Sequence, residues 1–212
     1  MKEKSCIIFL NGDTPHKKVV KNYISKDTII IGADGGANHL INYNIIPNII
    51  IGDMDSIKQS NLKKFHNAGA EIVKISEQET TDFEKCLMYC LKNKILNISV
   101  FGGASPRADH TLNNYSVMKR YYKKLNIKLI DDIFEISFIN KLIKFNYRKD
   151  ELISLLPLPK ANRVTTTGLE FPLKEETLEF GTREGTLNKS VSTKVSISFK
   201  GGSLLLFKKH FL

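Results

Sequence analysis

The sequence predicts an α/β protein, in which an N-terminal domain carries a mainly parallel sheet with helices on both faces and a C-terminal all-β domain resembles a sandwich or barrel. Two observations predict this class. Up to about residue 125, apolar runs rich in isoleucine and valine alternate with segments of helical periodicity. Beyond that point, short β-rich runs follow one another between turn residues. We expect an α/β domain at 1–138 and a β-rich domain at 139–212.

The first domain is expected to alternate strands and helices along the chain. The expected strands are Ser5–Asn11, Asp27–Gly32, Ile49–Ile51, Glu71–Ile75 and Asn97–Gly102. Helices are expected at about 37–44, 58–67 and 111–123, and a further helix begins at Thr81. Alternation of this kind is typical of a parallel sheet, which binds ligands beyond the carboxyl ends of its strands.

The helix that begins at Thr81 has the clearest signals. Thr81 and Glu84 have the spacing of a capping box, in which each side chain bonds the other residue's backbone. Apolar residues then recur at the spacing of one helix face: Phe83, Cys86, Leu87, Cys90 and Leu91.

The β-rich half is expected to form short antiparallel strands. The expected strands are Lys128–Ile130, Phe134–Ile139, Ile143–Asn146, Leu152–Leu156, Arg163–Thr167, Ser192–Phe199 and Ser203–Phe207. Proline and glycine turns separate them, which suits a small sandwich or barrel.

Composition excludes several classes of protein. Hydrophobic residues make up 42% and charged residues 25%, as in ordinary globular proteins. The formal charge of +10 is scattered in single and paired lysines, so we expect no nucleic-acid partner. The first apolar run, Cys6–Leu10, is too short for a signal peptide, and no run has the length of a membrane span. With three cysteines, expected to be reduced, a cytoplasmic location follows.

One strand end carries two closely spaced carboxylates. Ile49–Ile51 leads directly into Gly52-Asp53-Met54-Asp55-Ser56. Two unit charges about 4 Å apart repel by roughly 4 kcal/mol at an effective dielectric constant near 20, which favours a cation between them. The alternative is an ordinary aspartate-rich turn, with a positive φ at Gly52 and Ser56 capping the next helix.

Further acidic residues follow the other expected strands or begin their helices. In the expected sheet the acids all face one crevice: Asp34, Asp53, Asp55, Asp82 and Asp109. Oxygen ligands without a Cys/His cluster suit Mg²⁺, and the fork of Arg107 matches a phosphate. The helix starts after Gly35-Gly36 and at Thr81-Asp82 offer free N–H groups to an anion.

Each of these features also has an ordinary structural interpretation. Gly35-Gly36 suits a tight turn, Asp82 a first helical turn, Arg107 with Asp109 a surface ion pair, and His110 a solvated or capping position. A Walker loop and a kinase H-R-D motif are both absent from the sequence, so phosphoryl chemistry would follow another template.

The motifs together resemble the thiamin pyrophosphokinase (thiamin diphosphokinase) family. The resemblance rests on Asp34-Gly35-Gly36-Ala37-Asn38, Gly52-Asp53-Met54-Asp55-Ser56, Gln78 with Thr81-Asp82, Arg107-x-Asp109-His110 with Asn113, and Gly168-Leu169-Glu170-Phe171-Pro172-Leu173. These motifs stand in the family's order over nearly the whole chain.

The resemblance implies an enzyme that transfers the pyrophosphoryl group of ATP to thiamin, giving thiamin diphosphate and AMP. It implies catalytic roles for Asp53, Asp55, Asp82, Arg107 and Asp109, with the four aspartates gathering Mg²⁺. It implies substrate-binding positions at Asp34, Gly35, Gly36, Ser56, Gln78, Thr81, His110, Asn113, Leu187 and Asn188. It also implies a homodimer with active sites between subunits.

The chain departs from the family pattern in two places. Ser105-Pro106 stands where the family commonly has two glycines before the arginine, and Leu187-Asn188 stands where it has Ser-Asn. The chain has no tryptophan, so stacking on thiamin would fall to an aromatic residue such as Phe171 or Phe180.

Two other functions compete with this interpretation. An aspartate-nucleophile phosphatase also places Asp-x-Asp after a strand, although Gly52 intervenes here. A basic nucleotide- or RNA-binding module would use the positive surface and leave the acids structural.

Overall fold

The computed structural model describes residues 4–211, which form two compact units. The first unit runs to Asp132, and the second is Ile133–Phe211. The two compact units meet between Asp132 and Ile133, shortly before the boundary expected at 138/139. The functional domains 1–138 and 139–212 stay a prediction. The two units are described separately.

A parallel sheet forms the centre of the first unit. Its strands are β1 (Ser5–Phe9), β2 (Ile29–Ala33), β3 (Ile49–Gly52), β4 (Glu71–Lys74), β5 (Asn97–Phe101) and β6 (Asn126–Ile130). They lie in the order β4-β3-β2-β1-β5-β6, and every neighbouring pair is parallel. This pairing confirms the predicted mainly parallel sheet. Its apolar strands are buried because helices cover both faces of the sheet.

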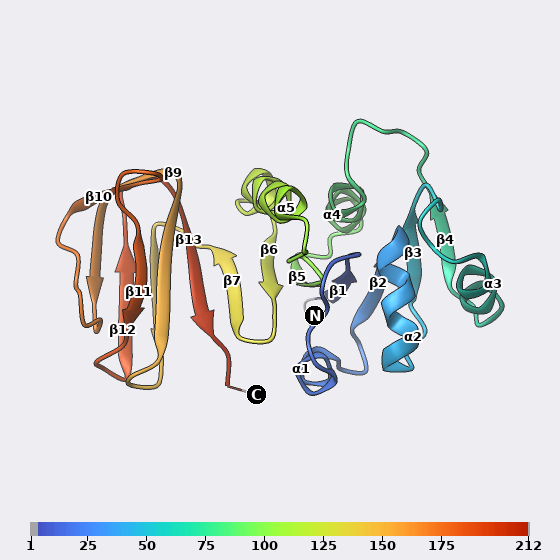
Figure 1. The fold of residues 1–212 in the computed structure, drawn as a ribbon, viewed down its shortest axis with the longest axis horizontal. Helices are drawn as coiled ribbons and strands as arrows, with labels where there is room; N and C mark the ends of the chain where they lie inside the picture. Colours follow the sequence, from blue (N-terminus) through green and yellow to red (C-terminus); the bar gives the residue numbers. More distant parts are fainter. Residues whose placement is uncertain (1–3, 212) are drawn as a thin grey trace. The chain divides into compact units, whose positions relative to one another are not determined.

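Helices connect the strands, as Figure 1 shows. They are α1 (Lys17–Tyr23), the 3₁₀ helix η1 (Asp34–His39), α2 (Leu40–Tyr43), α3 (Gln59–Asn67), α4 (Asp82–Lys92) and α5 (Ala108–Tyr121).

The two faces of the sheet pack against different helices. Ile7 and Phe9 share a core with Val20 of α1, Leu40 of α2 and Phe65 of α3. On the opposite face, the Sγ atom of Cys6 lies 3.5 Å from that of Cys90 on α4. Alternate residues of β1 therefore contact helices on opposite faces, as the sequence predicted.

Several local details differ from the expectations. The helix α1 was not predicted, because its two buried residues, Val19 and Val20, give no extended apolar stripe. Thr81 is the N-cap of α4, as expected, but the Glu84 carboxylate does not close the capping box. It accepts a hydrogen bond from the Tyr121 hydroxyl (3.0 Å) and pairs with the Arg120 guanidinium (2.9 Å), which ties α4 to α5.

The second unit is an antiparallel β domain around one core, as predicted. Its strands are β7 (Phe134–Phe138), β8 (Leu142–Asn146), β9 (Leu152–Thr167), β10 (Glu176–Glu179), β11 (Gly185–Lys189), β12 (Lys194–Ser198) and β13 (Gly201–Lys209). The order is β7-β13-β9-β12-β8, and both β10 and β11 also pair with β9. Two runs that the sequence suggested as separate strands, 152–156 and 163–167, belong to the single strand β9, while β10 and β11 were missed.

Tyr147 stabilises this unit through its hydroxyl group. The side chain is 6% exposed. Its hydroxyl donates to the Leu152 carbonyl (2.7 Å) and accepts from the Lys209 N–H (2.8 Å), so it joins segments far apart in sequence.

We predict that Tyr147→Phe lowers the free energy of unfolding by about 1 kcal/mol, because two partly buried backbone groups lose their hydrogen-bond partner. Urea denaturation measures this, with Tyr89→Phe as the control. Burial also raises the pKa of Tyr147 to about 12. Its contribution is therefore fully present below about pH 10 and is lost as the pH rises from about 10 to about 12, and the variant should lack this alkaline loss. Equal unfolding free energies for Tyr147→Phe and the wild type would contradict the prediction.

Candidate active site

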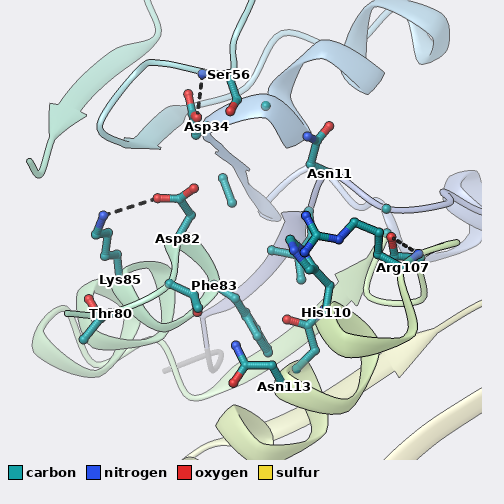
Figure 2. A pocket seen from close by; sticks show the side chains of 18 of the residues that line it. Asn11, Asp34, Ser56, Thr80, Asp82, Phe83, Lys85, Arg107, His110 and Asn113 are labelled. Atoms are coloured by element: carbon teal, nitrogen blue, oxygen red, sulfur yellow. Dashed lines mark hydrogen bonds and ion pairs between the residues drawn. The ribbon is translucent and has the colours of Figure 1, made fainter. Parts of the chain in front are cut away.

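A pocket of about 770 Å³ lies at the carboxyl ends of the parallel strands. Its lining comes from the segments after β1, β2, β3 and β5 and from the starts of α4 and α5 (Figure 2). The pocket brings together most of the predicted site residues: Asp34, Gly35, Asp53, Asp55, Ser56, Gln78, Thr81, Asp82, Arg107, Asp109, His110 and Asn113.

Three aspartates form a compact acidic group at the pocket. Single carboxylate oxygens of Asp34, Asp53 and Asp55 lie within 4.8 Å of one another. The amide of Gln78 donates to Asp53 (2.9 Å) and is the main cause that lowers the pKa of its carboxyl. The Ser56 hydroxyl donates to Asp55 (2.7 Å), so Ser56 does not cap the following helix, whose N-cap is Lys58.

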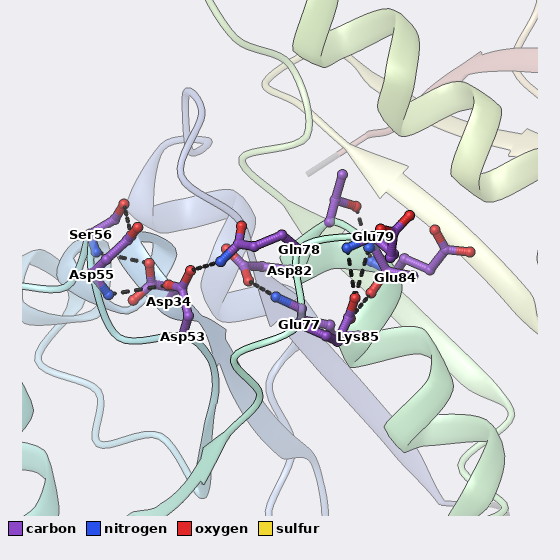
Figure 3. A network of polar contacts seen from close by, with 12 residues as sticks. Asp34, Asp53, Asp55, Ser56, Glu77, Gln78, Glu79, Asp82, Glu84 and Lys85 are labelled. Atoms are coloured by element: carbon purple, nitrogen blue, oxygen red, sulfur yellow. Dashed lines mark hydrogen bonds and ion pairs between the residues drawn. The ribbon is translucent and has the colours of Figure 1, made fainter.

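Asp34 holds the loop that carries the other two acids. It is 1% exposed, and its two oxygens accept from the backbone N–H groups of Ser56 (3.0 Å) and Ile57 (3.2 Å). Burial raises the pKa of Asp34, while these two hydrogen bonds oppose the rise. The expected substrate-binding role of Asp34 stays a prediction. The structure places Asp34 in the acidic group and against the backbone of the Asp53–Ser56 loop (Figure 3).

The Gly35-Gly36 turn is required by close packing. A Cβ atom on Gly36 would lie 2.1 Å from the Phe9 carbonyl oxygen, and one on Gly35 would lie 2.7 Å from the Asn11 amide nitrogen. The expected helix start here is the 3₁₀ helix η1 followed by the four-residue helix α2. Anion binding at this helix start stays a prediction, and the longer helices α4 and α5 also begin at the pocket.

The start of α4 places Asp82 beside Lys85. The Thr81 hydroxyl accepts from the Glu84 N–H (3.3 Å), and the Lys85 ammonium lies 3.5 Å from an Asp82 oxygen. Burial raises the pKa of Asp82, although the charge of Lys85 opposes this. Asp82 also faces Asp34 and Asp53, because its carboxylate lies close to Gly52 at the end of β3.

Arg107 and Asp109 form a bidentate pair at the start of α5. The guanidinium contacts the two Asp109 oxygens at 2.7 Å and 3.3 Å, and this bond lowers the pKa of Asp109. The side chains are 68% and 63% exposed. Ser105, one of the departures from the family pattern, orders the preceding loop: its hydroxyl accepts from the Arg107 N–H (3.2 Å), and its own N–H donates to Thr111 (3.0 Å).

Asn11 and Lys85 are two of the pocket residues that were not proposed from the sequence. Asn11 lies two residues after the end of β1, and Figure 2 shows its side chain directed into the pocket. The rule that selected the acids, a polar residue at a strand end, would have selected it. Lys85 stands one helical turn after Asp82, and only its 3% exposure reveals it as unusual.

The predicted residues of the second unit are arranged differently. Leu187 is 81% exposed and has a positive φ of 58°. Asn188 is buried, and its amide bonds both backbone groups of Phe171, at 3.1 Å and 2.8 Å. Phe171 and Phe180 are 64% and 54% exposed. Asn188 thus holds the loop from which Phe171 projects.

The fold is that of an α/β protein whose pocket, at the strand ends, is lined by carboxylates, by Lys85 and Arg107, and by the starts of α4 and α5. Residues 20–130 match the family model "Thiamin pyrophosphokinase, catalytic domain", and residues 140–204 match "Thiamin pyrophosphokinase, vitamin B1 binding domain". The chain therefore belongs to the thiamin pyrophosphokinase family.

Individual relatives agree with this assignment. The chain is 27% identical to thiamin pyrophosphokinase 1 of Caenorhabditis elegans, over 97% of this chain and 90% of the relative. It is 28% identical to thiamine pyrophosphokinase of Bacillus subtilis, over 88% and 89%. The crystal structure of a Bacillus subtilis thiamine pyrophosphokinase superposes with a TM-score of 0.86 at 26% identity, covering 99% of this chain and all of that chain. The phosphatase and RNA-binding alternatives are not favoured.

We predict that Thr81→Ala destabilises the protein by about 1 kcal/mol, because the N-terminal turn of α4 loses its side-chain acceptor. Thr81→Ser keeps the hydroxyl and is the matched control. Urea denaturation of the three proteins measures the difference. The predicted cap contribution is wrong if the alanine and serine variants unfold at the same denaturant concentration.

Proposed function

We propose that the chain transfers the pyrophosphoryl group of ATP to the hydroxyethyl oxygen of thiamin, giving thiamin diphosphate and AMP. Membership of the thiamin pyrophosphokinase family supports this reaction. The observation that carries the proposal for this chain is the convergence of Asp53, Asp55, Asp82, Arg107 and Asp109 on one pocket at the strand ends.

The pocket also suits Mg²⁺, because its donors are carboxylate oxygens, which hard cations prefer. We propose Asp53, Asp55, Asp82 and Asp109 as the residues that hold the ion. Asp53 and Asp55 belong to the compact acidic group. Asp34 completes that group, but backbone N–H groups already occupy its oxygens, which supports an orienting role for it. When bound, the ion would neutralise charge on the triphosphate.

The chain's own groups would bind and orient the substrates. Arg107 offers a planar fork for a phosphate once Asp109 turns to another partner. The N-terminus of α5 adds free backbone donors beside Arg107. The thiamin hydroxyl would attack the β-phosphorus in line with the departing AMP, and most of the rate would come from positioning and electrostatic stabilisation.

We assign thiamin binding chiefly to the β-rich domain. Residues 140–204 match the vitamin B1 binding model, which supports this division of roles. Leu187, Asn188 and the exposed ring of Phe171 are the proposed contributors, with Gln78 from the first domain. Since the Asn188 amide is engaged with Phe171, we propose that it shapes the binding loop.

The assembly and location are also proposals. We propose a homodimer with active sites between subunits and a cytoplasmic location. All three cysteines are free thiols, which supports a reducing compartment. Within residues 4–211, no helix has both the length and the apolar character needed to cross a bilayer.

The reaction itself is the first prediction. Incubation of the purified protein with ATP, Mg²⁺ and thiamin should yield AMP and thiamin diphosphate in equal amounts, measured by chromatography. Omission of thiamin and chelation of the metal are the controls, and each should abolish AMP formation. Release of ADP or free phosphate instead would contradict pyrophosphoryl transfer.

The acidic residues can be tested separately. Asp53→Asn and Asp55→Asn should each lower turnover on the order of 10²-fold, as expected for loss of one preorganised electrostatic group. Asp150→Asn changes an exposed carboxylate outside the pocket and is the matched control. Near-normal turnover in both site variants would remove these residues from the mechanism.

A further inference from the structure

Lys85 is a buried lysine on the wall of the active-site pocket. It lies on α4, one turn after Asp82, and is 3% exposed. Its neighbours on the helix, Glu84 and Cys86, are also buried. Lysine is almost never fully buried unless its ammonium group is paired, so this position needs an explanation.

The hydrogen bonds of Lys85 are incomplete. Within residues 4–211, its ammonium group has one hydrogen-bond partner, the Asp82 carboxylate at 3.5 Å, which is a long contact. An ammonium group has three N–H donors. Two donors therefore have no protein acceptor, and an unsatisfied buried donor is unfavourable. An acceptor-rich ligand in the pocket would satisfy them.

The charges around Lys85 indicate what that ligand does. The ammonium acts electrostatically on Asp82, Asp53 and Glu77, so it lies at the acidic side of the pocket. The other cation of the pocket wall, Arg107, comes from the start of α5 and is paired with Asp109. Figure 2 shows the two cationic groups on opposite sides of the pocket, with Asp82 on the Lys85 side.

We propose that Lys85 contacts phosphate oxygens of the pyrophosphoryl group that is transferred, a role in addition to that of Arg107. This inference rests on the proposed function. A polyphosphate that extends across the pocket would place one end near Arg107 and the other near Lys85. Phosphate oxygens would supply the acceptors that Lys85 lacks, and the fixed charge would stabilise the negative charge of the transferred group.

A counter-ion for the acids is the competing role, and it makes a different prediction. A lysine that only pairs with Asp82 affects every anion in the pocket alike. A lysine that contacts the transferred group affects pyrophosphate and leaves AMP, the leaving group, nearly unchanged. Separate binding of these two ligands distinguishes the roles without relying on turnover.

The test is calorimetric titration of the full chain with inorganic pyrophosphate and with AMP, both in the presence of Mg²⁺. Lys85→Met should weaken pyrophosphate binding on the order of 10- to 100-fold, the range for loss of one charge-assisted hydrogen bond, and should change AMP binding by less than about threefold. Lys92→Met is the matched control, because this exposed lysine ends the same helix. It should leave both affinities unchanged.

Lys85→Met leaves the Asp82 carboxylate buried without its partner, and this could prevent folding. A second pair of variants therefore removes the charge of Asp82 as well. Asp82→Asn alone and with Lys85→Met should differ in pyrophosphate affinity by a similar factor. The inference is overturned if the two Asp82→Asn proteins bind pyrophosphate equally, or if Lys85→Met binds it as tightly as the wild type does. It is also overturned if Lys85→Met weakens pyrophosphate and AMP binding equally, or if the wild type makes thiamin diphosphate without binding pyrophosphate. A wild type that binds pyrophosphate through Lys85 but makes no thiamin diphosphate would contradict the proposed function alone.

Discussion

The crowding of carboxylates at one edge of the parallel sheet is the constraint on which the site depends. Two unit charges about 4 Å apart at an effective dielectric constant near 20 repel by roughly 4 kcal/mol, so each acid needs a compensating group. The structure supplies a different one each time. Backbone N–H groups bind Asp34, an amide binds Asp53, and an ammonium group faces Asp82. Because these partners come from separate loops, the acids are fixed in place before any ligand binds.

A polar contact outside the proposed mechanism joins α4 to α5, the two helices that begin at the pocket. Glu84 has the sequence position of a capping residue, yet its carboxylate joins Tyr121 and Arg120 of α5. It thereby ties together the two helices whose first turns carry Asp82 and Arg107. A local sequence signal has given way here to a tertiary contact, because a buried carboxylate is stabilised more by a guanidinium and a hydroxyl than by one backbone N–H at an exposed helix end.

Much of the fold and most of the pocket residues could be predicted, because they follow from local patterns in the sequence. The features that could not be predicted depend on contacts between distant segments. Ile49–Ile51 and the other apolar runs have the length and composition of buried parallel strands, and polar residues at their carboxyl ends must meet at one edge. Geometry within that edge could not be predicted. Nothing in the sequence shows that Asp34 bonds the loop after β3, that Lys85 is buried, or that residues 152–167 form one long strand, since each depends on packing between distant segments.

The acidic pocket belongs to a protein with a formal charge of +10, and this contrast fits an enzyme for anionic substrates. A basic surface raises the local concentration of nucleotides and the rate at which they arrive. The carboxylates inside would then repel a bare triphosphate and accept one whose charge a cation has reduced. The surface would thus favour encounter, and the pocket, if it holds the proposed metal ion, would favour the metal-bound form of the substrate. Lys85 and Arg107, on the pocket wall, lie beside the proposed metal ligands Asp82 and Asp109 and would add further positive charge for the phosphates.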